Sequence, residues 1–159
     1  MDYFHSRLTD DQFERIRRLI YDQAGIEMEP QKKSMVEVRL RKRLAQLAFS
    51  SFGEYEHYLF SPEGMKVELV NMVDALTTNT THFFRESPHF DFLLKHVLPD
   101  LVERQRVSGT GRPLRIWSAG CSSGEEPYTL GMLLSEFAEG TPGFDFSIIG
   151  TDISTTVLD

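Results

Sequence analysis

The small residues between positions 118 and 125 are the part of this sequence best suited to ligand binding. The segment reads Ser-Ala-Gly-Cys-Ser-Ser-Gly-Glu, with glycines at Gly120 and Gly124 and an acid at Glu125. An apolar run precedes it and a helical pattern follows, so a ligand could approach the backbone closely and meet N–H groups of the helix. A second acid, Asp152, follows the next apolar run. We therefore expect a ligand site built from this loop and Asp152.

The residues at and after the two glycines indicate which type of ligand-binding loop this segment is. A phosphate-binding P-loop requires a lysine after its second glycine, where this chain has Glu125. A dinucleotide-binding loop requires three glycines in the pattern G-x-G-x-x-G, and only two can be matched here. An S-adenosylmethionine site has no phosphates to neutralise, so Glu125 could bind the ligand's ammonium or sugar hydroxyls, and Asp152 both ribose hydroxyls. The acidity of the loop favours this last interpretation.

The same loop satisfies G-x-S-x-G, the nucleophile elbow of α/β hydrolases, with Ser122 as the nucleophile. Those enzymes place their acid and histidine after the serine in the chain. All five histidines of this chain precede Ser122. A serine hydrolase with its partners further along the chain stays open as an alternative.

The elements that must position these residues begin with a helical part. Over 1–76 the apolar residues recur at helical spacing, which predicts a small all-α domain of four helices. Thr9 and Gln12 form a capping box for the first helix, and Gly25 is expected to end it. Pro30 favours the start of the second helix. The apolar seam of that second helix is Val36, Leu40, Leu44 and Leu47.

Two shorter helices are expected over 51–60 and 64–76, with Ser61 and Pro62 as the turn between them. Their apolar residues are predicted to be buried. These residues are Tyr55, Leu59, Val67, Leu69, Val70 and Val73.

Residues 77–86 have neither helical nor strand periodicity, and we expect an ordered connection there. Phe83 and Phe84 are predicted to be core residues, because adjacent aromatic side chains in a connection usually fill a groove. Ser87 is expected to cap the next helix, with Pro88 at its first position.

From Leu114 onward the pattern changes to strand, glycine loop, helix and strand. The apolar runs cover 114–117 and 144–149, and the helical pattern between them covers 127–138. This order predicts the opening unit of an α/β domain with parallel strands. The fold class is therefore an all-α domain over 1–76, followed over 77–159 by a connection and the first part of a Rossmann-like domain.

The composition excludes several classes of protein. With 40% hydrophobic and 26% charged residues, the chain is neither disordered nor rich enough in apolar runs to span a membrane. Its start lacks a secretory signal, so a cytoplasmic protein without membrane insertion is expected. The single cysteine, Cys121, cannot form an internal disulfide or a cysteine-based zinc site, and no histidine spacing suggests a metal.

A basic stripe is predicted on the second helix, in a chain of formal net charge −7. At about 100° per residue, four cations fall within one arc beside the apolar seam. An acidic protein partner is one explanation and a solvated face is another. Nucleic acid is disfavoured, because the rest of the chain is acidic and has no recognition motif. The four residues of this basic stripe are Lys32, Arg39, Lys42 and Arg43.

Three linked motifs resemble the chemotaxis receptor methyltransferases, the CheR family. They read T-N-x-T-x-F-F-R-E at 78–86, I-W-S-A-G-C-S-S-G-E-E-P-Y at 116–128 and G-T-D-I at 150–153. The resemblance covers almost the whole chain. It implies a protein-glutamate O-methyltransferase, which transfers a methyl group from S-adenosylmethionine to glutamates on chemoreceptor helices and leaves S-adenosylhomocysteine.

The resemblance also implies roles for particular residues. Arg85 is expected to hold the carboxylate of the cofactor or to orient the acceptor glutamate, because its planar fork suits carboxylates. Family members continue through further strands, so we expect the chain to end within the catalytic domain and to be inactive alone. A non-catalytic receptor-binding module is a second alternative. The positions implied to contact the cofactor are Asn79, Thr81, Arg85, Ala119, Gly120, Glu125 and Asp152.

Overall fold

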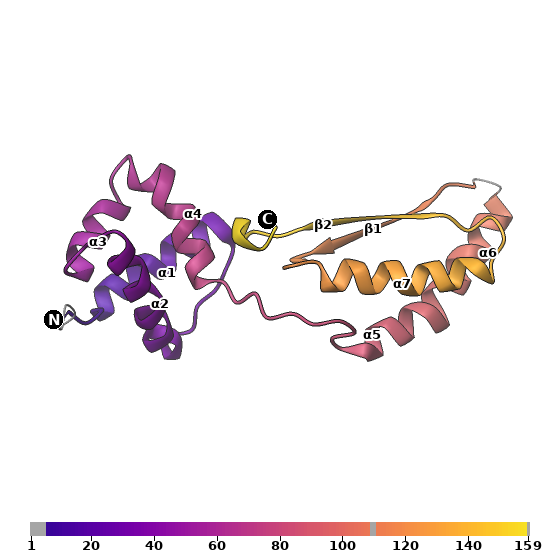
Figure 1. Cartoon of the computed structure of the whole chain (residues 1–159), viewed down its shortest axis with the longest axis horizontal. Helices are drawn as coiled ribbons and strands as arrows, with labels where there is room; N and C mark the ends of the chain where they lie inside the picture. The colour runs from indigo at the N-terminus through magenta and orange to yellow at the C-terminus, as the bar shows by residue number, and fades with distance from the viewer. Residues whose placement is uncertain (1–5, 109–110, 159) are drawn as a thin grey trace. The chain divides into compact units, whose positions relative to one another are not determined.

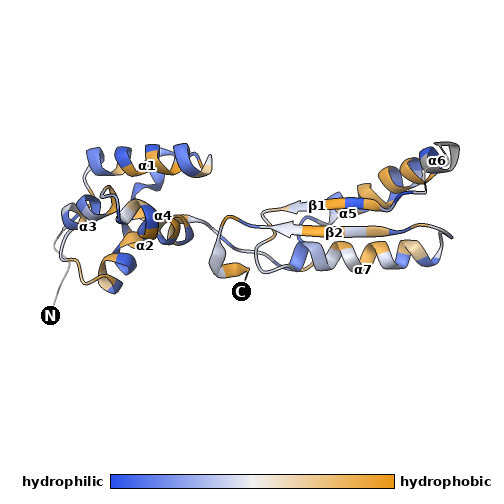
Figure 2. Cartoon of the chain, turned by 90° about the horizontal axis from the view of Figure 1, so that it is seen from above, coloured by the Kyte–Doolittle hydropathy of each residue, from blue (hydrophilic) through white to orange (hydrophobic). Residues whose placement is uncertain are grey.

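The computed structural model describes residues 6–108 and 111–158, which divide into two compact units (Figure 1). The helical unit comprises Met1–Thr78 and Ile153–Thr156, and the α/β unit comprises Asn79–Asp152 and Val157–Asp159. In Figure 2 the helices of both units carry hydrophilic and hydrophobic residues side by side, as amphipathic helices do. No helix among the described residues is both long and apolar enough to cross a bilayer.

In the described part of the helical unit there are four α-helices, as the periodicity predicts. Thr9 and Gln12 form the predicted capping box, and Gly25 ends the first helix in the left-handed conformation with φ 66°. Pro30 opens a short 3₁₀ turn directly before the second helix. The elements are α1 (Asp10–Ala24), the turn η1 (Pro30–Lys32), α2 (Lys33–Gln46), α3 (Phe52–Leu59) and α4 (Gly64–Leu76).

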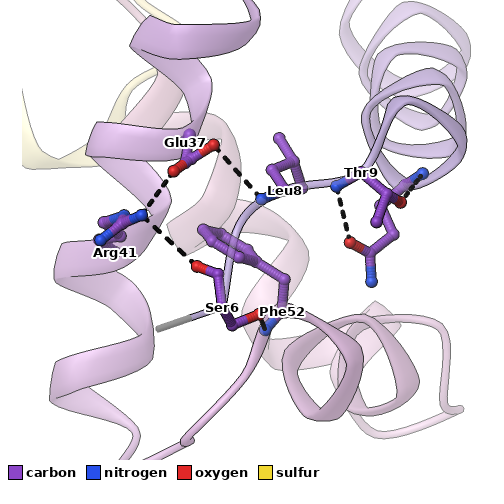
Figure 3. A network of polar contacts seen from close by, with 7 residues as sticks. Ser6, Leu8, Thr9, Glu37, Arg41 and Phe52 are labelled. Atoms are coloured by element: carbon purple, nitrogen blue, oxygen red, sulfur yellow. Dashed lines mark hydrogen bonds and ion pairs between the residues drawn. The ribbon is translucent and has the colours of Figure 1, made fainter. Parts of the chain in front are cut away.

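The segment before α1 is held by polar contacts to α2 and α3 (Figure 3). Arg41 donates to the carbonyl oxygen of Ser6 at 3.4 Å and to Glu37 at 2.5 Å. Glu37 also accepts from the N–H of Leu8 at 3.3 Å. The N–H of Phe52, the first residue of α3, donates to the hydroxyl of Ser6 at 3.3 Å. These bonds place Leu8 in the core of the unit, where it is buried.

The predicted apolar face of α4 is partly wrong. Val67 and Val70 are 56% and 46% exposed, whereas Glu68 between them is 1% exposed. Glu68 accepts two hydrogen bonds from Arg43, at 3.0 and 2.6 Å, and one from the hydroxyl of Tyr55 at 3.0 Å. Because these partners satisfy the carboxylate, the helix turns its acid toward the core and leaves two valines in solvent. Tyr55, Leu59 and Val73 are buried as predicted, and Leu69 is partly buried.

The α/β unit begins with an irregular connection, as predicted, but its details differ. Phe83 and Phe84 are 53% and 48% exposed, so the prediction that they are core residues is wrong. Ser87 is the first helical residue rather than the cap, and the capping position falls on Glu86 in the left-handed conformation. The helical segments that follow are α5 (Ser87–Phe92), a π-helical turn (Leu93–Val97) and α6 (Leu98–Ser108).

Two parallel strands and one helix form the predicted βαβ unit. Strand β1 (Leu114–Ala119) leads through the glycine loop into α7 (Glu125–Glu139), and β2 (Phe146–Thr151) pairs with β1 in parallel. Helix α7 packs on one face of this pair, where Leu130 and Leu134 meet Ile116 and Ile148.

The other face of the strand pair carries Trp117 and Ile149, which are register partners and are 70% and 61% exposed. Strand β2 starts two residues later than predicted, because Phe144 closes a turn onto the carbonyl of Thr141. The predicted fold class, an all-α domain followed by the first part of a Rossmann-like domain, is confirmed.

Candidate functional site

The glycine loop is bonded to the end of β2. The N–H groups of Gly120 and Cys121 both donate to the carbonyl oxygen of Thr151, at 2.7 and 2.9 Å. Gly120 has φ 81°, and a Cβ added there would meet no described atom within 4 Å. The loop therefore turns sharply away from β1 and leaves open space over Gly120, where a ligand could approach the backbone.

Ser122 joins three segments that the sequence keeps far apart. Its N–H donates to Oδ2 of Asp152 at 2.7 Å, and its hydroxyl donates to the carbonyl oxygen of Asn79 at 2.9 Å. Ser122 has φ 48°, a conformation that costs a non-glycine residue energy and that its two bonds compensate. The structure thus brings together three parts of the chain that the sequence analysis expects at the cofactor, namely Asn79, the loop and Asp152.

Acidic residues line the start of α7. Glu125, the first helical residue, accepts from the hydroxyl of Ser123 at 2.7 Å, and Glu126 accepts from the buried hydroxyl of Ser118 at 2.6 Å. Both carboxylates lie in the first turn, where the helix dipole favours negative charge. Gly124 precedes them with φ 102°, so the loop enters the helix through a conformation that favours glycine. The partly exposed carboxylate of Glu125 is available to a positively charged or hydroxyl-bearing ligand.

Thr129 is a positioning residue that the sequence motifs do not identify. Its side chain is fully buried, and its hydroxyl donates to the carbonyl of Glu125 at 2.6 Å. The same hydroxyl accepts from the N–H of Phe84 at 3.2 Å. Thr129 therefore fixes the segment around Arg85 to the first turn of α7. A hydroxyl four residues after the loop acid is the only sequence signal of this contact.

Arg85 is held within its own segment. Its guanidinium donates to the carbonyl of Thr80 at 2.6 Å, and its N–H donates to the carbonyl of His82 at 3.3 Å. Its side chain is exposed and Thr81 is partly exposed, so both can meet a ligand from solvent. Phe84 and Glu86, on either side of Arg85, have left-handed φ angles of 57°. Strained backbone of this kind is concentrated at ligand sites in proteins.

Cys121 is a packing residue. It is 5% exposed, and a Cβ at Gly150 would lie 3.0 Å from its sulfur. A side chain at Gly150 would crowd Cys121, so the glycine lets β2 pass close to the loop. Ala119, at the end of β1, pairs in register with Thr151 beside it.

The basic stripe predicted on α2 separates into two kinds of residue. Arg39 donates to the carbonyl oxygens of Leu76 and Thr77, at 2.7 and 2.8 Å, and Arg43 pairs with the buried Glu68. These two guanidiniums stabilise the helical unit. Lys32 and Lys42 are exposed and present their charge to solvent.

Two family models match the chain and together cover most of it. The model described as CheR methyltransferase, SAM binding domain, matches residues 79–159, and the one described as CheR methyltransferase, all-alpha domain, matches residues 11–77. The architecture is thus that of a methyltransferase with a helical domain before its cofactor domain. The chain belongs to the CheR methyltransferase family.

Curated relatives agree with this assignment. The chemotaxis protein methyltransferase of Borreliella burgdorferi is 42% identical over 153 residues, which are 96% of this chain and 53% of the relative. The Escherichia coli protein of the same name is 40% identical, over 96% of this chain and 49% of the relative. Chemotaxis protein methyltransferase 2 of Pseudomonas aeruginosa is 42% identical, over 95% and 50%. The chain spans about half the length of the curated relatives it matches.

Proposed function

We propose that this protein is a cytoplasmic, S-adenosylmethionine-dependent methyltransferase that methylates glutamate side chains of chemoreceptors. The observation that carries the proposal is the convergence of Asn79, Ser122 and Asp152 at the end of the parallel strands. Membership of the CheR family and the names of the relatives support the same activity.

The residues of the site fit S-adenosylmethionine. The open space over Gly120 admits a ligand to the loop backbone, and Asp152 provides a carboxylate, the type of group that accepts hydrogen bonds from ribose hydroxyls. Glu125 suits the ammonium group of the methionyl part. When bound, S-adenosylmethionine would supply an electrophilic methyl group on a sulfonium sulfur.

The protein's own contribution is mainly to position the reactants. A glutamate has a reference pKa of about 4.3, so at neutral pH the acceptor is already a nucleophilic carboxylate and needs no general base. Alignment of two reactants in a partly desolvated site is worth up to about 7 to 11 kcal/mol. Arg85 is the candidate for orienting the acceptor carboxylate, since its guanidinium presents paired donors.

The geometry does not support the hydrolase alternative. Ser122 is 7% exposed, and its hydroxyl donates to a backbone carbonyl instead of facing an open cleft. Such a serine is a structural link between two segments. The relatives named above are likewise methyltransferases.

We further propose that α2 contacts the acidic receptor helices through Lys32 and Lys42. Both side chains are exposed, whereas the guanidiniums of Arg39 and Arg43 are bonded inside the helical unit. Receptor helices that carry several glutamates are complementary in charge to these lysines.

A methyl-transfer assay tests the proposed activity. The full-length protein is incubated with S-adenosylmethionine labelled in its methyl group and with a purified receptor cytoplasmic domain. Glutamate methyl esters hydrolyse in mild alkali and release labelled methanol, whereas methyl groups on nitrogen do not. We expect alkali-labile label on the receptor, and alkali-stable label or no transfer would contradict the proposal.

A further inference from the structure

Two of the boundaries between the units fall directly beside proposed cofactor residues. The chain leaves the helical unit after Thr78, one residue before Asn79, and re-enters it at Ile153, one residue after Asp152. Within the helical unit, each of these crossing segments is bonded to the side chain of one helix residue. Those two residues, Arg39 and Asp74, have no part in the site described above.

Asp74, on α4, anchors the segment that follows Asp152. Its Oδ1 accepts from the N–H of Thr155 at 3.1 Å, and its Oδ2 accepts from the hydroxyls of Thr155 and Thr156 at 2.9 and 3.0 Å. Ser154, directly before these threonines, is fully buried. One carboxylate of α4 therefore receives three bonds from a segment 81 and 82 residues later in the chain.

Arg39, on α2, anchors the segment that precedes Asn79. Its guanidinium donates to the carbonyls of Leu76 and Thr77 and, at 3.0 Å, to the hydroxyl of Thr78. These acceptors belong to the last residue of α4 and to the two residues after it. The planar guanidinium of Arg39 therefore fixes the segment in which the chain leaves the helical unit. The backbone of Asn79, which accepts from Ser122, begins at the next residue.

We propose that Asp74 and Arg39 are positioning residues for cofactor binding, because they anchor the segments that carry Asp152 and Asn79. The inference rests on the proposed function for its ligand. Thr155 lies three positions after Asp152, a tether of at most about 11 Å when fully extended. Both anchors belong to the helical unit, so they limit how far the segments that carry Asp152 and Asn79 can move relative to each other, and Ser122 bonds to both of these residues.

The test compares Asp74→Ala with Asp74→Asn in the full-length protein. The alanine variant removes both acceptor oxygens and with them all three hydrogen bonds, and we expect the dissociation constant for S-adenosylhomocysteine to rise about 5- to 20-fold. Asparagine keeps one oxygen acceptor and can donate to a hydroxyl, so it should restore part of the affinity. The matched control is Asn71→Ala, one turn earlier on α4, whose side chain donates within its own helix to the carbonyl of Val67.

A double-mutant cycle shows whether Asp74 acts through Asp152. In an Asp152→Ala background, Asp74→Ala should change the affinity less than twofold, since the group it positions is gone. Arg39→Lys, which retains charge but not the fork, should weaken binding in both backgrounds, because it acts on the Asn79 segment. Fully additive effects of Asp74→Ala and Asp152→Ala would overturn the proposed route.

A readout without ligand separates this inference from the proposed function. Hydrogen exchange at the Ser122 N–H, which donates to Asp152, should accelerate in Asp74→Ala and remain as in the wild type in Asn71→Ala. If the wild type fails to bind S-adenosylhomocysteine, the proposed function is wrong. The exchange rate of the Ser122 N–H in Asp74→Ala then still shows whether Asp74 positions Asp152. If the wild type binds and Asp74→Ala has unchanged affinity and unchanged exchange, the inference is wrong.

Discussion

Oδ2 of Asp152 accepts a 2.7 Å hydrogen bond from the N–H of Ser122, a residue 30 positions earlier in the chain. This bond joins the end of β2 to the loop after β1, so the acid that we assign to the ribose also shapes the loop. The hydroxyl of Ser122 also donates a hydrogen bond to the carbonyl oxygen of Asn79, so Ser122 links Asp152 to the Asn79 segment. The ligand site is thus a small hydrogen-bonded unit, and changes at one of its members should affect the others.

Arg85→Lys should lower turnover, although it conserves the charge. A point charge cannot reproduce the paired donors of a guanidinium, and the bond from Arg85 to the carbonyl of Thr80 would also be weakened. We expect kcat/KM for receptor methylation to fall about tenfold or more, which corresponds to about 1.4 kcal/mol. Arg104→Lys, at an exposed position of α6, is the matched control and should retain normal kinetics. Wild-type turnover in Arg85→Lys would remove this residue from the site.

Arg43→Ala should destabilise the helical unit strongly. The change leaves the carboxylate of Glu68, which is 1% exposed, without its ionic partner, and breaking a buried pair from one side costs about 3 to 5 kcal/mol. Urea denaturation followed by circular dichroism measures this loss. Arg15→Ala removes a cation that is half exposed and should have a much smaller effect. Equal losses in the two variants would show that burial of Glu68 has no special role.

The ion pair between Arg15 and Glu56 should make stability depend on pH on the acidic side. Hydrogen bonding from Arg15 lowers the pKa of Glu56 below its ordinary value, so the pair stabilises the fold above the unfolded pKa of about 4.3. The stabilisation is lost as the pH falls through the lower, folded pKa. Arg15→Gln should therefore lower the free energy of unfolding at pH 7 but not near pH 2. An NMR titration that finds the same Glu56 pKa in both proteins would contradict this assignment.

Charge reversal at Lys32 and Lys42 should weaken receptor binding without unfolding the protein. Both lysines are exposed, and attraction between exposed charges is screened over about 8 Å at physiological salt. We expect the double variant to bind the receptor domain more weakly and with a flatter dependence on salt than the wild type. Lys66→Glu, an exposed change on α4, provides the comparison. Binding that does not respond to salt in the wild type would exclude an electrostatic contact.

Local patterns predicted most elements of the fold, because caps and periodicity act within a few residues. The capping box at Thr9, the end of α1 at Gly25 and the whole extent of α4 (Gly64–Leu76) were predictable for this reason. The burial of Glu68 was not, since it depends on Arg43, which lies 25 residues away. A helix with valines on one face and a glutamate on the other has two possible orientations, and only the tertiary partner selects between them.

The site shows the same division between local and long-range information. The motifs identified the loop and Asp152, but the bond that joins them could not be deduced from spacing. Asn79 contacts Ser122 through its backbone carbonyl, a group that every residue has, so its side-chain type gave no indication of this contact. Phe83 and Phe84 remain exposed because hydrogen bonds of the backbone, such as that from Phe84 to Thr129, determine the path of their segment.

The most direct test of the central claim is a calorimetric titration of S-adenosylhomocysteine into the full-length protein and its Asp152→Ala variant, with ATP as the competing ligand. We expect the wild type to bind S-adenosylhomocysteine and not ATP, because the acids at Glu125 and Asp152 suit a ligand without phosphates. Asp152→Ala should weaken binding by about 1 to 3 kcal/mol, the cost of lost acceptors for buried hydroxyls. Equal affinity in the two proteins, or preference for ATP, would contradict the assignment of this loop and Asp152 as the cofactor site.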